Sequence, residues 1–382
     1  MTVLESDIPT LPKLLLPLER ERDGAWHSGA DRLFCPNITD LEPVHFQKAE
    51  QLIHRMADAL QGGAPGAFNE ARRLLLQMLR KHGEPIAQWN PLVLEFVDPA
   101  FLRGANLPGI DLTMTRLRSV LGSVSLEGAC LQGAGFLCAD LREVNLAEAD
   151  LTGADLRFAD LAEVNLSGAV LIEAKLGSAR LGSSCLEKAN LYCANLNGAN
   201  LRHAILQDAN LRKADLRNTD CCRANLRYAR LQHADLREAN FLMAELTGAK
   251  LRHSDLRKTY LGFSCLREAR FQDAHLHETD FSGADLTLAN FQKCRIANAV
   301  FSRAMMTGVT MRGAEFQEVS FLECCELETA NLQEARFDDA TCFPPAFFPD
   351  RYAMQSKPSG VLTRLIKLMD GFRKDQPLLP QR

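Results

Sequence analysis

Large apolar side chains recur at every fifth position along more than half of the chain. From Leu121 to Phe321 they define 41 consecutive five-residue units, in which Leu fills 29 of the positions and Phe fills 8. A small side chain, usually Ala, stands two residues before each large one, and Asn or Asp often stands between the two, as in residues 149–161, ADLTGADLRFADL. This period matches neither the 3.6 residues of an α-helical turn nor the two-residue alternation of a strand.

A period of five is satisfied if the chain runs extended for a few residues and then turns a corner. The small residue and the large residue, two positions apart, then point to the same side of the chain. We expect that side to face inward, because a residue larger than Ala beside Leu or Phe would overpack a narrow interior. Gly at the second position after the large residue, as at Gly153 and Gly283, suits a corner with positive φ. The pattern therefore predicts an all-β solenoid whose stacked coils pair as in a parallel sheet.

The A-(D/N)-L-x-x pattern resembles the pentapeptide-repeat family over roughly residues 101–342. The resemblance implies a right-handed, quadrilateral parallel β-helix with four units, or twenty residues, in each coil. Two interruptions fall near the ends of the repeat. The step from Leu117 to Leu121 is four residues, and one residue is inserted between Phe321 and Leu327. Between Leu102 and Phe337 each large apolar residue of the pattern is assigned to the interior.

The segments outside the repeat predict helices that cover its ends, since the end coils of a solenoid need covers. Residues 1–100 are expected to form an N-terminal helical module, with amphipathic helices at 44–61 and 67–81 joined by a Gly-rich turn at 62–66. A partner-docking role for this module is the alternative. The apolar stripes of the two helices consist of Leu52, Ile53, Met56 and Leu60, and of Leu74, Leu75, Met78 and Leu79.

Residues 343–382 are expected to form a C-terminal cap that contains a short helix at 360–374. The helix is predicted to cover the last coil. A homodimer through this helix is the alternative, because the resemblance extends to quinolone-resistance members in which such a segment makes a dimer. The candidate cap or dimerisation residues are Leu362, Leu365, Ile366, Met369 and Phe372.

Charge is nearly balanced over the whole chain but not along it. The sequence has 44 Lys and Arg against 48 Asp and Glu. Residues 171–270 hold 17 basic and 10 acidic side chains, whereas residues 271–340 hold 5 and 12.

When the repeat is folded in coils of twenty residues, outward residues fall into columns. Two columns in the basic region form a candidate interaction strip for an acidic partner. A solvated, salt-bridged face is the alternative. The strip consists of Arg217, Arg237, Arg257, His233 and His253.

No pattern in the sequence indicates catalysis or a cofactor. The twelve cysteines include no C-x-x-C pair, so neither a zinc finger nor a redox motif is predicted. His233, His253 and Asp273 share a column that a metal could use, but we expect a surface ladder and no metal site. The Gly-rich turn at 62–66 lacks the Gly-Lys-Ser/Thr ending of a phosphate loop. The sequence shows neither a signal peptide nor a stretch long enough to span a membrane.

These observations favour a non-enzymatic scaffold or adaptor that presents the outer faces of a β-helix to a protein partner. We expect the protein in a bacterial cytoplasm and expect no direct contact with nucleic acid. Secretion as an effector, without a cleaved signal peptide, is the alternative to a cytoplasmic location. The alternative is a topoisomerase-binding regulator, because gyrase-protecting members of the family resemble duplex DNA in shape and in continuous negative charge. The basic residues 171–270 have the wrong sign for that mechanism.

Overall fold

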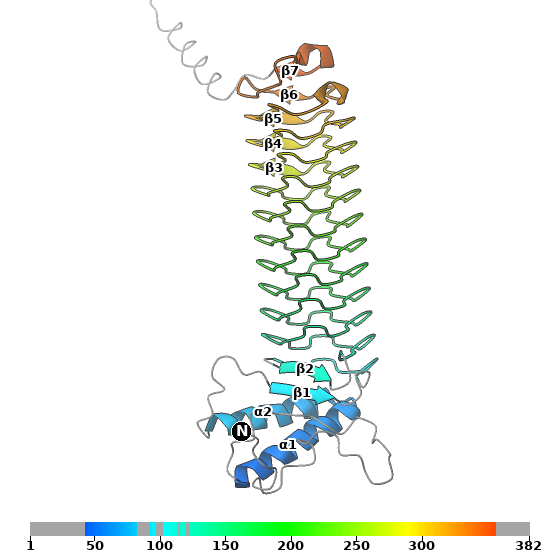
Figure 1. The fold of residues 1–382 in the computed structure, drawn as a ribbon, viewed down its shortest axis with the longest axis vertical. Helices are drawn as coiled ribbons and strands as arrows, with labels where there is room; N and C mark the ends of the chain where they lie inside the picture. Colours follow the sequence, from blue (N-terminus) through cyan, green and yellow to red (C-terminus); the bar gives the residue numbers. More distant parts are fainter. Residues whose placement is uncertain (1–42, 82–91, 97–101, 114, 120–122, 357–382) are drawn as a thin grey trace, which may run out of the picture. The chain divides into compact units, whose positions relative to one another are not determined.

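The computed structural model describes residues 43–81, 92–96, 102–113, 115–119 and 123–356. The chain divides into two compact units, one ending at Arg230 and the other beginning at Leu231. Figure 1 shows the stacked coils of the repeat. The segment 360–374, with the candidate dimerisation residues named above, lies outside the described residues. Within each unit the repeat winds as stacked coils, and each unit is described here by itself.

Parallel pairing between residues twenty positions apart holds the coils together in both units. In the first unit, the Leu131 amide donates to the Asp150 carbonyl at 2.7 Å, and the Asp150 amide donates to the Ala129 carbonyl at 2.9 Å. In the second unit, Leu251 donates to Arg270 at 2.7 Å in the same way. Four five-residue units therefore complete one coil, which confirms the parallel β-helix of the pentapeptide-repeat type.

The interior follows the predicted register. In the five-residue repeats from Leu126 to Phe321, each large apolar residue of the pattern is buried, with at most 3% of its surface exposed. The small residues that precede them are buried as well. Where the small residue is Ser or Thr, its hydroxyl donates to a main-chain carbonyl, as from Thr259 to Leu236 at 2.9 Å. A polar group thus enters the interior only with its hydrogen bond satisfied.

The frequent Asn or Asp before the large residue stabilises the turn that follows. Its side-chain oxygen accepts the amide of the residue two positions later, as from Thr152 to Asp150 at 3.0 Å and from Asn197 to Asn195 at 3.0 Å. This Asx turn is a local interaction that Asn and Asp make better than other side chains. It explains why these two residue types recur at one position of the repeat.

The second residue after the large one has a left-handed conformation at nearly every corner. Gly153 and Gly283 have φ of 67° and 66°, as the sequence predicts. Glu, Lys, His, Arg and even Phe occupy the same position elsewhere with φ near 57°. The coil therefore imposes this conformation on residues that disfavour it by about 1–2 kcal/mol each.

A pair of glycine substitutions separates backbone strain from crowding. A Cβ added at Gly153 would meet nothing within 4 Å, whereas a Cβ added at Gly283 would lie 2.7 Å from the Phe263 ring. We expect Gly153→Ala to lower the free energy of unfolding by about 1 kcal/mol and Gly283→Ala by about 1 kcal/mol more. Urea unfolding checks both, and Phe263→Ala should remove the excess in a double variant. Equal losses for the two glycines would contradict the crowding.

The first unit begins with two helices, α1 (Pro43–Gln61) and α2 (Pro65–Lys81), which pack against each other. Leu52, Ile53, Met56 and Leu60 of the predicted stripe are buried, as is Leu75 of α2; the side chains of Met78 and Leu79 lie outside the described part. Polar side chains fasten α2 to the first coil. Asn69 donates to the Gly109 carbonyl at 2.7 Å, and Arg72 donates to Asp111 at 2.7 Å and also to the Thr113 carbonyl.

The interruption between Leu117 and Leu121 coincides with a coil of different length. The structure pairs Asn106 with Cys130 and Arg116 with Asp140, so this coil is four residues longer than the regular twenty-residue coils. β2 (Thr115–Ser119) lies within this longer coil and pairs in parallel with β1 (Leu92–Phe96), which precedes it in the chain.

The second unit has short strands of two or three residues on one side of its coils. They are β3 (His275–His277), β4 (Arg295–Ala297), β5 (Glu315–Gln317), β6 (Arg336–Phe337) and β7 (Gln355–Ser356), paired in that order as a parallel sheet. Two 3-10 turns, η3 (Leu327–Thr329) and η4 (Pro349–Tyr352), interrupt the last coils. Pairing of Thr310 with Asn331 confirms the one-residue insertion after Phe321. The coil continues past residue 342, because β7 still pairs with β6.

Candidate interaction faces

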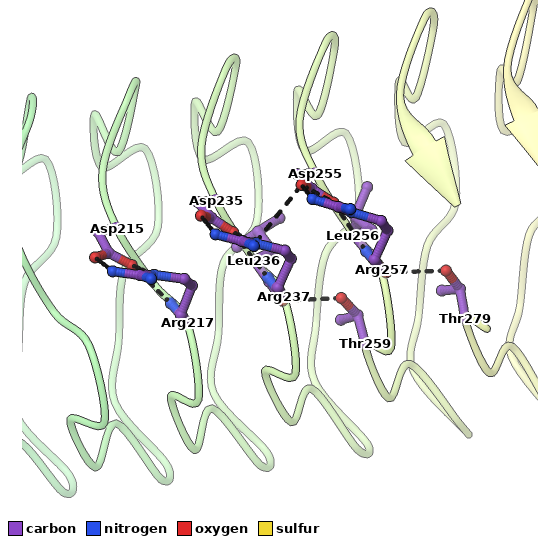
Figure 2. A network of polar contacts seen from close by, with 10 residues as sticks. All are labelled: Asp215, Arg217, Asp235, Leu236, Arg237, Asp255, Leu256, Arg257, Thr259 and Thr279. Carbon is purple, nitrogen blue, oxygen red and sulfur yellow. Dashed lines mark hydrogen bonds and ion pairs between the residues drawn. The ribbon is translucent and has the colours of Figure 1, made fainter. Parts of the chain in front are cut away.

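The arginines of the predicted strip are engaged by aspartates of the same repeat. In the second unit, Arg237 Nε and Nη2 donate to the two carboxylate oxygens of Asp235 at 2.8 and 2.6 Å. Arg257 binds Asp255 in the same forked geometry at 2.8 and 2.6 Å. Arg237 Nε also lies 3.6 Å from Asp255 Oδ2 on the next coil. Acidic and basic groups therefore alternate along this column, as Figure 2 shows.

Each fork forms because the main chain places Asp and Arg side by side. In the sequence Asp-Leu-Arg the Leu points inward, so its two neighbours point outward together. The Arg257 amide donates to the same Asp255 carboxylate at 3.2 Å. Partial burial disfavours the ionised form of Asp255, but the hydrogen bonds from Arg257 outweigh it and hold the pKa of Asp255 below its ordinary value. These hydrogen bonds in turn raise the pKa of Arg257.

The first unit contains the same motif. Arg217 forks onto Asp215 at 2.8 and 2.7 Å (Figure 2), and Arg157 forks onto Asp155 at 2.8 and 2.6 Å. The partner aspartates are the residues that the column analysis missed. The recurrent Asp-Leu-Arg sequence could have indicated these pairs, because its spacing brings opposite charges together within one five-residue repeat. The strip has the geometry of a salt-bridged face, and its arginines offer an acidic partner little free positive charge.

The two histidines of the strip lie on the neighbouring column of the second unit. The rings of His233 and His253 are stacked, with centroids 4.9 Å apart and an interplanar angle of 12°. Both side chains are exposed and occupy corners of successive coils. Among the residues that the structure describes, no group of three His, Cys, Asp or Glu side chains could hold a metal ion. Asp273, the third member of that column, therefore does not complete a metal site with them.

A basic face adjoins the salt-bridged column. We use this name for Lys250, Arg252 and Arg270, together with His233 and His253. Lys250 and Arg270 pair directly across neighbouring coils. No ion pair within 4 Å is found in the described part of the chain for Lys250, Arg252 or Arg270. Free positive charge is thus located here rather than on the arginine strip.

An exposed apolar patch, which the sequence analysis did not identify, lies on another side of the same coils. Phe263, Tyr260 and Met243 are 63%, 55% and 46% exposed. Met243 and Phe263 occupy the same corner on successive coils, since Met243 donates its amide to the Gly262 carbonyl at 3.0 Å. Half-buried Leu242 covers Gly262, at 3.4 Å from a Cβ placed there. The patch combines outward positions of several units, and only their placement in the coil brings them together.

The cysteines buried in the interior are not activated as nucleophiles. All of them are free thiols, and Cys221, Cys222 and Cys294 are buried. Burial raises the pKa of Cys221 to about 12 and that of Cys294 to about 12, so both remain protonated. No described helix has the length and apolar character needed to cross a bilayer.

A family model for pentapeptide repeats matches the chain in eight copies that together cover more than half of the sequence. The chain belongs to the pentapeptide-repeat family. The matched residues are 119–157, 139–177, 149–187, 171–208, 204–241, 244–283, 264–303 and 284–321.

Several solved structures match parts of the chain. HetL, from the cyanobacterium Nostoc sp. strain PCC 7120 and involved in heterocyst differentiation regulation, is 28% identical over 60% of this chain and 87% of HetL, with a TM-score of 0.26. A thylakoid lumen protein of Arabidopsis thaliana is 28% identical over 29% of this chain and 74% of its own, with a TM-score of 0.27. QnrB1, a plasmid-mediated fluoroquinolone resistance protein, is 15% identical over 53% of this chain and 97% of its own, with a TM-score of 0.29. No curated protein matches the sequence.

Proposed function

We propose that the chain is a non-enzymatic scaffold that binds a protein partner through outward faces of its second unit. The observation that carries the proposal is the exposed aromatic side chain of Phe263. It occupies a corner with φ of 55°, a conformation that a bulky residue disfavours, and 63% of its surface is exposed. Neither the backbone conformation nor burial in the interior explains why Phe stands at this position.

The surroundings of Phe263 suit an interface. Met243 and Tyr260 extend the apolar surface, and the missing side chain at Gly283 leaves room for the ring to lie close over the next coil. Exposed aromatic and methionine side chains are enriched at protein interfaces, where a few of them carry most of the binding free energy. A solenoid leaves such outward positions free to vary, because stability depends on inward packing between neighbouring coils.

The test compares Phe263→Ser with Leu288→Ser in the full chain. Leu288 is a matched control, because it is 58% exposed, has φ of 60° and also lies over a glycine, Gly308, of the next coil. The residue before Leu288 in its corner column is the charged Glu268, whereas the residue before Phe263 in its column is Met243. We expect at least one cellular protein to be retained by the wild type and by Leu288→Ser, but roughly tenfold less by Phe263→Ser. Quantitative mass spectrometry of bound proteins measures this, and identical sets for the two variants would contradict the proposal.

The topoisomerase-binding alternative rests on the acidic residues 271–340. Several carboxylates of this region are paired with arginines, which interrupts the negative charge. Glu323 lies 3.1 Å from Arg303, Glu334 lies 2.8 Å from Arg312, and Glu315 lies 3.5 Å from Arg336. A gyrase supercoiling assay distinguishes the two functions, because DNA mimicry requires inhibition or rescue by the added protein and the scaffold requires neither.

A further inference from the structure

The basic face places two like charges opposite each other with no acid between them. Lys250 and Arg270 are directly paired residues of neighbouring coils. Like charges in this position repel and destabilise a sheet. The column of Arg237 and Arg257 avoids this cost, because each guanidinium is bound to an aspartate. The fold therefore tolerates an unneutralised pair at Lys250 and Arg270 that it neutralises on the adjoining column.

Further polar groups of the same three coils point outward beside this pair. Arg252 is exposed, and the stacked imidazoles of His233 and His253 border it at the corner. The carboxamides of Gln232 and Gln272 occupy the position of Arg252 on the coils before and after it, and their Oε1 atoms are buried without a hydrogen-bond partner. Rotation of either carboxamide would allow it to accept an amide of a bound main chain. The acids nearest to Arg270 in the sequence, Glu268 and Asp273, lie at the corners on either side of it.

Resting on the proposed function, we propose that the basic face binds an acidic segment of the protein partner. The carboxylates of the segment would replace the acids that this face lacks, with Lys250, Arg252 and Arg270 as their counterions. Neighbouring coils are about 4.8 Å apart, so cations on two coils can bind carboxylates of one short segment. Such pairs give specificity and a faster association rate in addition to affinity.

The charge of the surrounding unit favours a short acidic peptide over a nucleic acid. Residues 231–356 hold 13 Lys and Arg against 18 Asp and Glu, a net charge of −5. A duplex presents phosphates over a long and wide surface, so it would also meet the acids that surround the face. A segment with a few carboxylates contacts the three cations alone. The local positive charge is therefore large enough for the peptide and too small for the polyanion.

The test uses fluorescein-labelled octaglutamate and the full chain, with fluorescence anisotropy at low ionic strength. The triple variant Lys250→Gln, Arg252→Gln, Arg270→Gln removes the basic face. The control triple variant Arg267→Gln, Arg303→Gln, Arg312→Gln makes the same change in net charge at arginines that pair with Asp285, Glu323 and Glu334. We expect the first variant to bind the peptide roughly tenfold more weakly or worse, and the control to bind within about twofold of the wild type.

Three results would overturn the proposal: no binding of octaglutamate by the wild type, equal losses in the two triple variants, or displacement of the peptide by duplex DNA at equal charge concentration. Circular dichroism confirms folding, and the single variant Arg252→Gln, at an exposed position, gives a second measurement if the triple variant is unstable. Phe263→Ser should bind octaglutamate as the wild type does. If octaglutamate does not bind, the result of the retention experiment with Phe263→Ser still stands. The two proposals therefore fail separately.

Discussion

Replacing Leu231 by Asp is expected to unfold the second unit at neutral pH. The Leu231 side chain has no exposed surface. The substitution loses about 1.5–3 kcal/mol of apolar burial, and desolvation of an unpaired carboxylate adds several kcal/mol more. That sum is comparable to the total stability of a typical domain, about 5–15 kcal/mol. Far-ultraviolet circular dichroism and urea unfolding measure the loss.

His233→Asp is the matched control for this prediction. It introduces the same carboxylate two residues later, at an exposed corner with φ of 61°, a conformation that Asp tolerates. We expect its free energy of unfolding to stay within about 0.5 kcal/mol of the wild type. A Leu231→Asp protein that melts like the wild type would show that the side chain is not in a dry interior.

Truncating Phe301 is expected to destabilise the second unit almost as strongly. Its ring stacks on those of Phe281 and Phe321, with centroids 4.9 and 5.0 Å apart, and meets the Phe291 ring edge to face at 6.2 Å. Phe301→Ala leaves a cavity in this column of rings, and we expect the free energy of unfolding to fall by about 3–5 kcal/mol. Phe301→Leu should cost less, because Leu fills most equivalent positions of the repeat. Thermal and urea unfolding give the values.

Phe263→Ala provides the comparison with the same chemical change on the outside. Because 63% of Phe263 is exposed, we expect it to cost less than about 1 kcal/mol. The two variants thus test whether phenylalanine stabilises this protein only where it faces inward. Similar losses for both would mean that Phe263 supports the fold, and the argument for its role in partner binding would fail.

The helical ends show how far local patterns extend. The predicted helices at 44–61 and 67–81 correspond to α1 (Pro43–Gln61) and α2 (Pro65–Lys81), and the buried stripe of α1 is the predicted one. Amphipathic spacing indicates which face of a helix is buried. It does not indicate the groups that contact that face, so the hydrogen bonds of Asn69 and Arg72 to the first coil could not be predicted.

The sequence by itself determined the interior of this protein. Inward positions must fit the same narrow space in each coil, so packing repeats in the sequence with a period of five, and the burial of residues such as Leu231 and Phe301 could be assigned from spacing alone. The four-residue step from Leu117 to Leu121 marks an irregular coil in the sequence, but only the pairing of Asn106 with Cys130 shows that this coil is four residues longer than the regular ones.

Only the tertiary structure decided which outward charges are free. Arg237 and Lys250 look alike in a column of sequence letters, yet Arg237 is bound to Asp235 and Lys250 faces Arg270 without a counterion. Whether a charge has a counterion depends on side-chain geometry over a few ångströms, both within one five-residue repeat and between coils twenty residues apart. The five-residue period constrains the inward residues and leaves the outward ones independent, so the faces that meet a partner had to be found in three dimensions.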